Sequence, residues 1–272
     1  MRFGRMGRAV VTAVMAATTL GSGTIAVGAP PKAGDDSTAY YTAVGRRIEQ
    51  VRRAGGNGGA VDRMLEREFG WVKVAGGTDG DDDLIALGTP SGSDVTINKA
   101  SVYRNTQQGR YEAVSTWQWK SCGVLRCWAA NYGDAYGNDG GPDGFGIVSS
   151  VANNPVTSFF ATYTERGALQ TYTNPDEIDG YGAGYSEQDR RFHARDFTWD
   201  HGTIIYGFNV RTCSGMKGTP WIFKSRMSHT WGDASIVSVS LGLGAVNFTF
   251  ANGSANKWSI YGNQLLYWYP CG

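Results

Sequence analysis

The stretch YEAVSTWQW, residues 111–119, alternates its side chains in the two-residue period of a half-buried β-strand. A second strand-like stretch, VTINKASVY, precedes it at residues 95–103. The connection NTQQG at 105–109 has the length of a hairpin loop, with glycine at its end. The two stretches therefore predict an antiparallel pair. Strand alternation places one set of side chains of the second strand on a common face: Tyr111, Ala113, Ser115, Trp117 and Trp119.

Further strand-like stretches follow, separated by turn signals such as Asn252-Gly253. They lie at 145–151, 158–164, 197–199, 203–212, 221–226, 235–243, 245–251 and 258–269. No helical crossover of the length that a parallel sheet needs lies between them. We therefore predict that residues 93–272 form a mainly β domain, an antiparallel β-sandwich or jelly roll. Tryptophans within these strands are expected to fill the interior: Trp117, Trp119, Trp221, Trp258 and Trp268.

The preceding segment, residues 30–92, has a helical pattern followed by a linker. Apolar residues recur at three- and four-residue steps from Tyr41 to Val51, and again from Val61 to Phe69. The glycine-rich run 55–59 separates the two stretches, and Gly70 ends the second. The sequence thus predicts a short N-terminal helical segment. Two roles stay open for it: permanent packing on the β domain, or a removable pro-segment or partner-docking arm.

The first 29 residues have the features of a secretory signal peptide. Arg2, Arg5 and Arg8 precede an apolar stretch at 9–20, and small residues follow up to Ala29. The apolar stretch is shorter than the roughly 20 residues that span a bilayer. We therefore expect a secreted, extracellular protein without stable membrane insertion.

Charge and cysteine content agree with that location. The chain has 25 basic and 24 acidic residues, so it lacks the basic excess of a nucleic-acid-binding protein. Four cysteines entering an oxidising compartment are expected to pair, and three connectivities are possible. Cys122 and Cys127 are close enough in sequence for a local bridge, which would leave Cys213 to pair with Cys271.

A glycine-rich stretch, GDAYGNDGGPDG at residues 133–144, is the densest polar cluster. Oxygen ligands close together in a turning backbone suit calcium, so Asp139 and Asp143 are candidate metal ligands, with Asn138 as a polar ligand-binding residue. Asp-Gly clusters also form plain exposed turns, which is the alternative.

Aromatic residues flank this stretch and a second glycine-rich segment at 179–185. Amphipathic rings beside polar groups suit sugars, because the apolar faces of sugars stack on them. The candidate stacking residues are Trp128, Tyr132, Tyr136, Tyr181 and Tyr185. We expect the two segments to meet in one concave site.

Catalytic motifs of hydrolases and nucleotide-binding enzymes do not occur in the chain. Glu112 and Glu165 lie in strand stretches and are the candidate acid and base if the protein hydrolyses glycosides. Whether the protein is an enzyme stays open at this point.

The sequence favours a secreted β-sandwich that binds carbohydrate or another cell-envelope component through aromatic-lined loops. One alternative is a secreted, glycosidase-like hydrolase made with an N-terminal pro-segment. The other is an extracellular toxin, inhibitor or structural protein that acts through protein contacts. The ligand, the oligomeric state and the disulfide connectivity are not determined by sequence.

Overall fold

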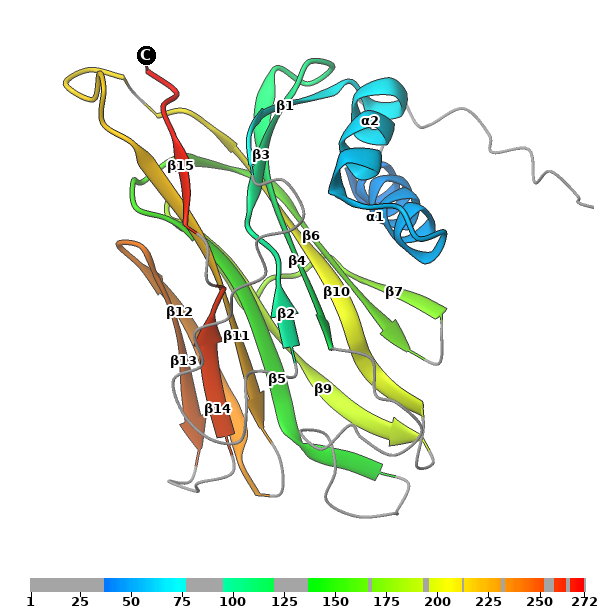
Figure 1. The fold of residues 1–272 in the computed structure, drawn as a ribbon. Coiled ribbons are helices and arrows are strands. Elements are labelled where there is room, and N and C mark those ends of the chain that lie inside the picture. The colour runs from blue at the N-terminus through cyan, green and yellow to red at the C-terminus, as the bar shows by residue number, and fades with distance from the viewer. Residues whose placement is uncertain are drawn as a thin grey trace, which may run out of the picture.

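The structure, a computed structural model, is an antiparallel β-sandwich covered by two helices on one face and by a β-hairpin on the other (Figure 1). This confirms the predicted fold class. The residues that the structure describes are 37–76, 95–119, 137–165, 168–192, 196–211, 213–230, 233–251, 257–262 and 265–271.

The helical segment consists of α1 (Ser37–Arg53) and α2 (Gly58–Phe69). The side chain of Asn57 caps the start of α2 by accepting a hydrogen bond from the Ala60 amide. Gly70 ends α2 with a φ of 67°, a left-handed conformation that glycine adopts without strain. Neither helix has the length and apolar character needed to cross a membrane, as far as the described chain goes.

The helix-side sheet lies under α1 and α2 (Figure 1). Its strands are β1 (Trp71–Ala75), β3 (Ser101–Asn105), β4 (Arg110–Trp119), β10 (Asp196–Asn209), β6 (Asn154–Glu165) and β7 (Ala168–Tyr172) in spatial order. The short β2 (Val95–Ile97) also pairs with β4, beyond the end of β3.

The hairpin-side sheet forms the second layer of the sandwich. Its strands are β8 (Glu177–Ile178), β9 (Gly182–Phe192), β5 (Gly137–Ser149) and β11 (Trp221–Thr230), with β14 (Lys257–Tyr261) and β15 (Leu266–Trp268) following each other along the far edge of β11. The long β10 joins the two layers. Its start, Asp196–Phe197, pairs with β9, and its remainder pairs with β4 and β6.

A hairpin of β12 (Ser235–Gly242) and β13 (Ala245–Ala251) covers part of the hairpin-side sheet. It packs closely because glycines of β5 and β9 lie beneath it. A Cβ atom at Gly144 would lie 2.3 Å from the Phe248 ring, and one at Gly146 would lie 2.8 Å from Val246. The absent side chains therefore create the space that the hairpin occupies.

Three apolar clusters lie between these layers. The largest fills the sandwich and includes Ala113, Trp117, Trp221 and Trp268, which confirms the predicted inward face of β4. A second lies between the helices and their sheet, and a third lies under the hairpin.

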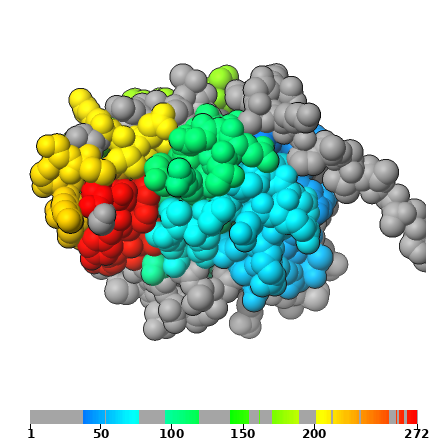
Figure 2. Space-filling model, turned by 90° about the horizontal axis from the view of Figure 1, so that it is seen from above, coloured from blue at the N-terminus to red at the C-terminus, as the bar shows by residue number. Residues whose placement is uncertain are grey.

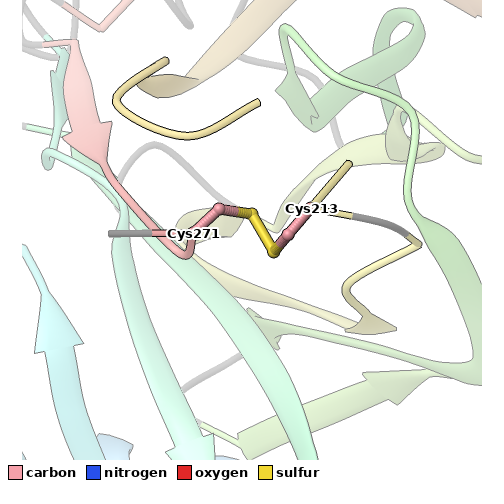
Figure 3. Close-up of a disulfide and its surroundings, with 2 residues drawn as sticks. All are labelled: Cys213 and Cys271. Carbon is pink, nitrogen blue, oxygen red and sulfur yellow. A yellow bond between two sulfur atoms is a disulfide. The ribbon is translucent and has the colours of Figure 1, made fainter. Parts of the chain in front are cut away.

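One disulfide joins Cys213, which follows β10, to Cys271, which follows β15 (Figure 3). The two Cα atoms are 5.3 Å apart, and 58 residues separate the cysteines in sequence. This confirms the predicted long bridge. Cys122 and Cys127 lie outside the described residues.

Several strands occur where the sequence indicated turns or loops. Residues 137–144, predicted as a glycine-rich turn, form the first half of β5. Residues 182–192 form β9, although their glycines and charges indicated a loop. The stretch 258–269, predicted as one strand, is divided between β14 and β15. β1 belongs to the segment predicted as helical, yet it pairs with β3 of the sandwich.

Candidate binding surface

Aromatic side chains of the described residues divide into buried and exposed groups. Trp71, Trp117 and Trp221 have no exposed surface, and Trp268 has 6%. This confirms the predicted interior position of three strand tryptophans, whereas the side chains of Trp119 and Trp258 lie outside the described residues. Two tyrosines next to the C-terminal cysteine are different, since Tyr267 is 52% exposed and Tyr269 is 55% exposed.

The exposure of Tyr267 follows from the alternation of β15. Leu266 and Trp268 point into the sandwich, where Trp268 packs edge-on against Trp221 with ring centroids 5.6 Å apart. Tyr267 lies between them and points outward, opposite Ile222 of β11. Figure 2 shows the C-terminal segment, in red, at the molecular surface beside the cyan segment with α2 and β1. The buried neighbours thus hold an exposed ring on a defined face.

The same outer face of β11 carries two cations. Lys224 Nζ lies 4.5 Å from the centroid of the Tyr261 ring, and the guanidinium carbon of Arg226 lies 4.8 Å from it. Arg226 is paired with Tyr261 across β11 and β14. Burial, and then the nearby Arg226, lower the pKa of Lys224. Such cation–ring contacts hold the charged groups over an aromatic platform.

We refer to this face as the outer β11 surface, made up of Ile222, Lys224, Arg226, Tyr261, Leu265 and Tyr267. The tip of the β12–β13 hairpin borders it, since a Cβ atom at Gly244 would lie 3.9 Å from Lys224 Cε. Leu243, also at the tip, is 74% exposed. Arg226 contacts the same hairpin, because it donates a 2.7 Å hydrogen bond to the Val246 carbonyl of β13. The surface therefore combines aromatic, apolar and cationic groups.

Within the described residues, the two glycine-rich segments do not bring Asn138 and Tyr181 together. Asn138 pairs with Arg190 at one end of the β5–β9 ladder, whereas Val148 pairs with Gly182 at the other. Asn138 and Tyr181 are thus separated by about ten strand positions, or roughly 30 Å. The sequence placed both in exposed turns, but they belong to the opposite ends of two long strands.

The other predicted ligand-binding residues have different positions. Trp128, Tyr132 and Tyr136 lie outside the described residues, as do the side chains of Asn138 and Asp139. Tyr185 has no exposed surface and stacks on Tyr172 in the interior, so in this structure it is a core residue and not a surface ring. Tyr181 is half-buried, and its carbonyl accepts a hydrogen bond from the Ser149 amide at the end of β5.

Asp143, predicted as a calcium ligand, is completely buried in β5. One of its oxygens lies 2.7 Å from His229 Nδ1, and the other accepts a 2.9 Å hydrogen bond from the Thr230 amide. This placement differs from the exposed turn that a calcium site was expected to use. Within the described ranges no three acidic, histidine or cysteine residues are grouped so that they could hold a metal ion. The pairing with His229 was missed because the two residues are far apart in sequence.

Glu112, a candidate catalytic residue, is completely buried between β4 and α1. Its Oε1 atom accepts hydrogen bonds from Tyr41 at 2.8 Å, Arg110 at 2.8 Å and Asn105 at 3.3 Å. Arg110 also donates to the Tyr41 hydroxyl. Glu112 Oε2 is buried without a partner among the described residues. Burial outweighs the nearby Arg110 and raises the pKa of Glu112 from 4.5 to about 7.

Glu112 therefore does not line an open catalytic site in this structure. Glu165 ends β6, and its side chain lies outside the described residues. Further polar contacts join α1 to the sheet: His201 Nε2 lies 2.7 Å from Glu49, and Arg52 donates a 2.7 Å hydrogen bond to Thr116.

No protein-family model matches the sequence, and no curated protein matches it. A solved structure described as "pH-induced modulation of Streptococcus parasanguinis adhesion by Fap1 fimbriae" is similar over 73% of this chain and 89% of its own. The TM-score is 0.32 and the sequence identity 12%, a level that assigns neither a family nor a function.

Proposed function

We propose that this protein is an exported β-sandwich that binds carbohydrate or another cell-envelope component through the outer β11 surface. The proposal rests on the exposure of Tyr267 and Tyr269 in a molecule whose described tryptophan side chains are buried. Exposed rings held by a rigid sheet suit the apolar faces of sugars. The Cys213–Cys271 disulfide supports export, because such bonds persist in oxidising compartments.

Retention on insoluble polysaccharides and on isolated cell envelopes tests this proposal. The wild-type protein should be retained, and the double variant Tyr267→Ala/Tyr269→Ala should lose most of its retention while keeping its thermal midpoint. Val237→Ala is the matched control, because Val237 is 59% exposed on the hairpin and away from β15. Equal retention of the double variant and the control would contradict a role for these tyrosines.

A second candidate is the hydrolase with a removable pro-segment, in which α1 covers Glu112. One observation favours it: most of the apolar cluster under the helices belongs to residues 40–69, and the sheet contributes Trp71, Tyr103, Val114 and Ile205. An interface with few apolar contacts and several polar ones resembles that between separable units. Amino-terminal sequencing of protein from culture medium tests it. A start beyond α2 would support a pro-segment, and a start before α1 would exclude one.

A further inference from the structure

We infer that the ligand of the outer β11 surface is an anionic polysaccharide, whose acidic groups contact Lys224 while its sugar rings pack on Tyr267. This inference rests on the proposed function and names the class of ligand that the same surface selects.

Two neighbouring cations of the outer β11 surface, Lys224 and Arg226, have no carboxylate partner among the described residues. Lys224 and Arg226 are two residues apart on one face of β11, so their backbone positions are about 7 Å apart. Both lie against the ring of Tyr261, and neither forms an ion pair with a carboxylate in the described part of the chain. The Nε atom of Arg226 is buried and has no hydrogen-bond partner among the described residues.

Several cations on the helix side of the molecule, in contrast, form ion pairs with carboxylates. Arg47 pairs with Glu68 at 2.7 Å, and Lys73 pairs with Asp62 at 2.8 Å. Arg110 likewise contacts the buried Glu112. The helix side thus supplies a carboxylate to each of these cations, whereas no described carboxylate pairs with Lys224 or Arg226 on the outer β11 surface.

The causes that lower the pKa of Lys224 are burial and Arg226, with no carboxylate acting in the other direction. A bound anion would offset both effects, since it replaces lost hydration and screens the like charge. Charge complementarity therefore favours an anionic occupant over a neutral one.

A third cation extends the charged face along the sheet. Lys257 lies four residues before Tyr261 in β14, on the same side of the strand, and its Nζ atom is 4.7 Å from the Phe250 ring. This position is about 13 Å further along the strand direction. A row of cations over such a length fits a polymer with repeated charges better than a single small anion.

Aromatic groups in the same face argue for a polysaccharide. Tyr267 of β15 pairs with Ile222 beside the cation pair, and Leu265 lies just before the strand; both side chains are exposed. The chain as a whole has 25 basic and 24 acidic residues, so it lacks the excess of basic residues that is typical of nucleic-acid-binding proteins. Sugar rings with carboxylate or phosphate substituents match both the tyrosine and the cations.

The test compares the binding of the purified, disulfide-bonded protein to three immobilised polymers: polygalacturonate, phosphorylated dextran and neutral dextran. We expect binding to at least one acidic polymer to exceed binding to dextran by about tenfold or more and to weaken at high salt. The two acidic polymers distinguish carboxylate from phosphate as the recognised group.

Lys224→Gln should weaken binding to the acidic polymer about tenfold and remove part of its salt dependence. Lys217→Gln is the matched control, because Lys217 is an exposed lysine outside this surface, and it should bind as the wild type does. Tyr267→Ala should weaken binding to every polymer that the wild-type protein binds. Thermal midpoints should verify that each variant folds.

Two negative outcomes are distinguishable. Salt-independent binding to dextran that depends on Tyr267 but not on Lys224 would overturn the anionic ligand and leave the proposed function intact. An absence of binding to all three polymers and to cell envelopes would overturn both.

Discussion

Glu112→Gln should remove most of the pH dependence of folding stability between pH 5 and pH 8. The carboxyl group of Glu112 has no exposed surface, and its pKa rises from 4.5 to about 7 on folding. Between these two values the unfolded chain has released a proton that the folded protein still holds. Rising pH therefore favours the unfolded state. Glu112 lies in β4 beneath α1, so the contact between α1 and the sheet should weaken as the pH rises.

The size of the effect follows from the two pKa values. Folding raises the pKa of Glu112 from 4.5 to about 7, and each pKa unit corresponds to ~1.4 kcal/mol, so the full loss of stability is about 3.5 kcal/mol. Most of it falls between pH 5 and pH 8. Glu68 acts in a separate range, because Arg47 lowers its pKa to about 2. Its contribution is present above pH 4.5 and is lost below that value.

Urea unfolding at pH 5, 6, 7 and 8 measures this dependence. Wild-type protein should lose about 2 to 3 kcal/mol across the series, whereas Glu112→Gln should stay nearly constant and exceed the wild type in stability at pH 8. Glu66→Gln, an exposed change in α2, should behave like the wild type. If Glu112→Gln retains the wild-type slope, another group causes the dependence and the assignment of the raised pKa to Glu112 is wrong.

Three further changes test the layers of the sandwich. Cys213→Ser opens a 58-residue loop and should lower the free energy of unfolding by up to about 4 kcal/mol in chemical denaturation; an unchanged value would contradict the loop-entropy argument. Gly144→Val should lower the free energy of unfolding by about 1–3 kcal/mol, because the hairpin leaves no room for the new side chain. Gly242→Val is the control: a Cβ atom there would have no atom within 4 Å, so the thermal midpoint should fall much less. Asp143→Asn weakens the contact with His229 and should cost about 2 kcal/mol, measured by urea midpoint, with retained stability counting against a buried structural pair.

The parts of the fold that were predictable depend on local periodicity. The alternation of residues 111–119 indicated β4 and its inward face, and the helical spacing up to Gly70 indicated α1 and α2. The Cys213–Cys271 bridge was predictable once Cys122 and Cys127 were assigned to each other. These features depend on residues that are close in sequence or on residue type, and the sequence shows both directly.

The parts that were not predictable depend on contacts between distant segments. Gly144 resembles a turn residue, but it lies in β5, where the Phe248 ring occupies the space above it. Asp143 resembles a calcium ligand until the fold places His229 beside it.

The exposed tyrosines of the C-terminal segment have a signal in the sequence. In residues 265–269 the alternation that buries Leu266 and Trp268 also exposes Tyr267 and Tyr269. A tyrosine that alternates with buried tryptophan and leucine near a disulfide was therefore recognisable as a surface ring. Lys224 and Arg226 were harder to recognise, because the sequence does not show which cations pair with a carboxylate and which do not.

The disulfide also determines when the tyrosine face exists. β15 is held to β11 by three residue pairs, Trp221–Trp268, Ile222–Tyr267 and Phe223–Leu266, and Cys271 follows directly after Tyr269 and Pro270. A strand this short frays easily once its covalent tie is cut. If this face binds its ligand as proposed, reduction of the disulfide should weaken binding before the sandwich melts.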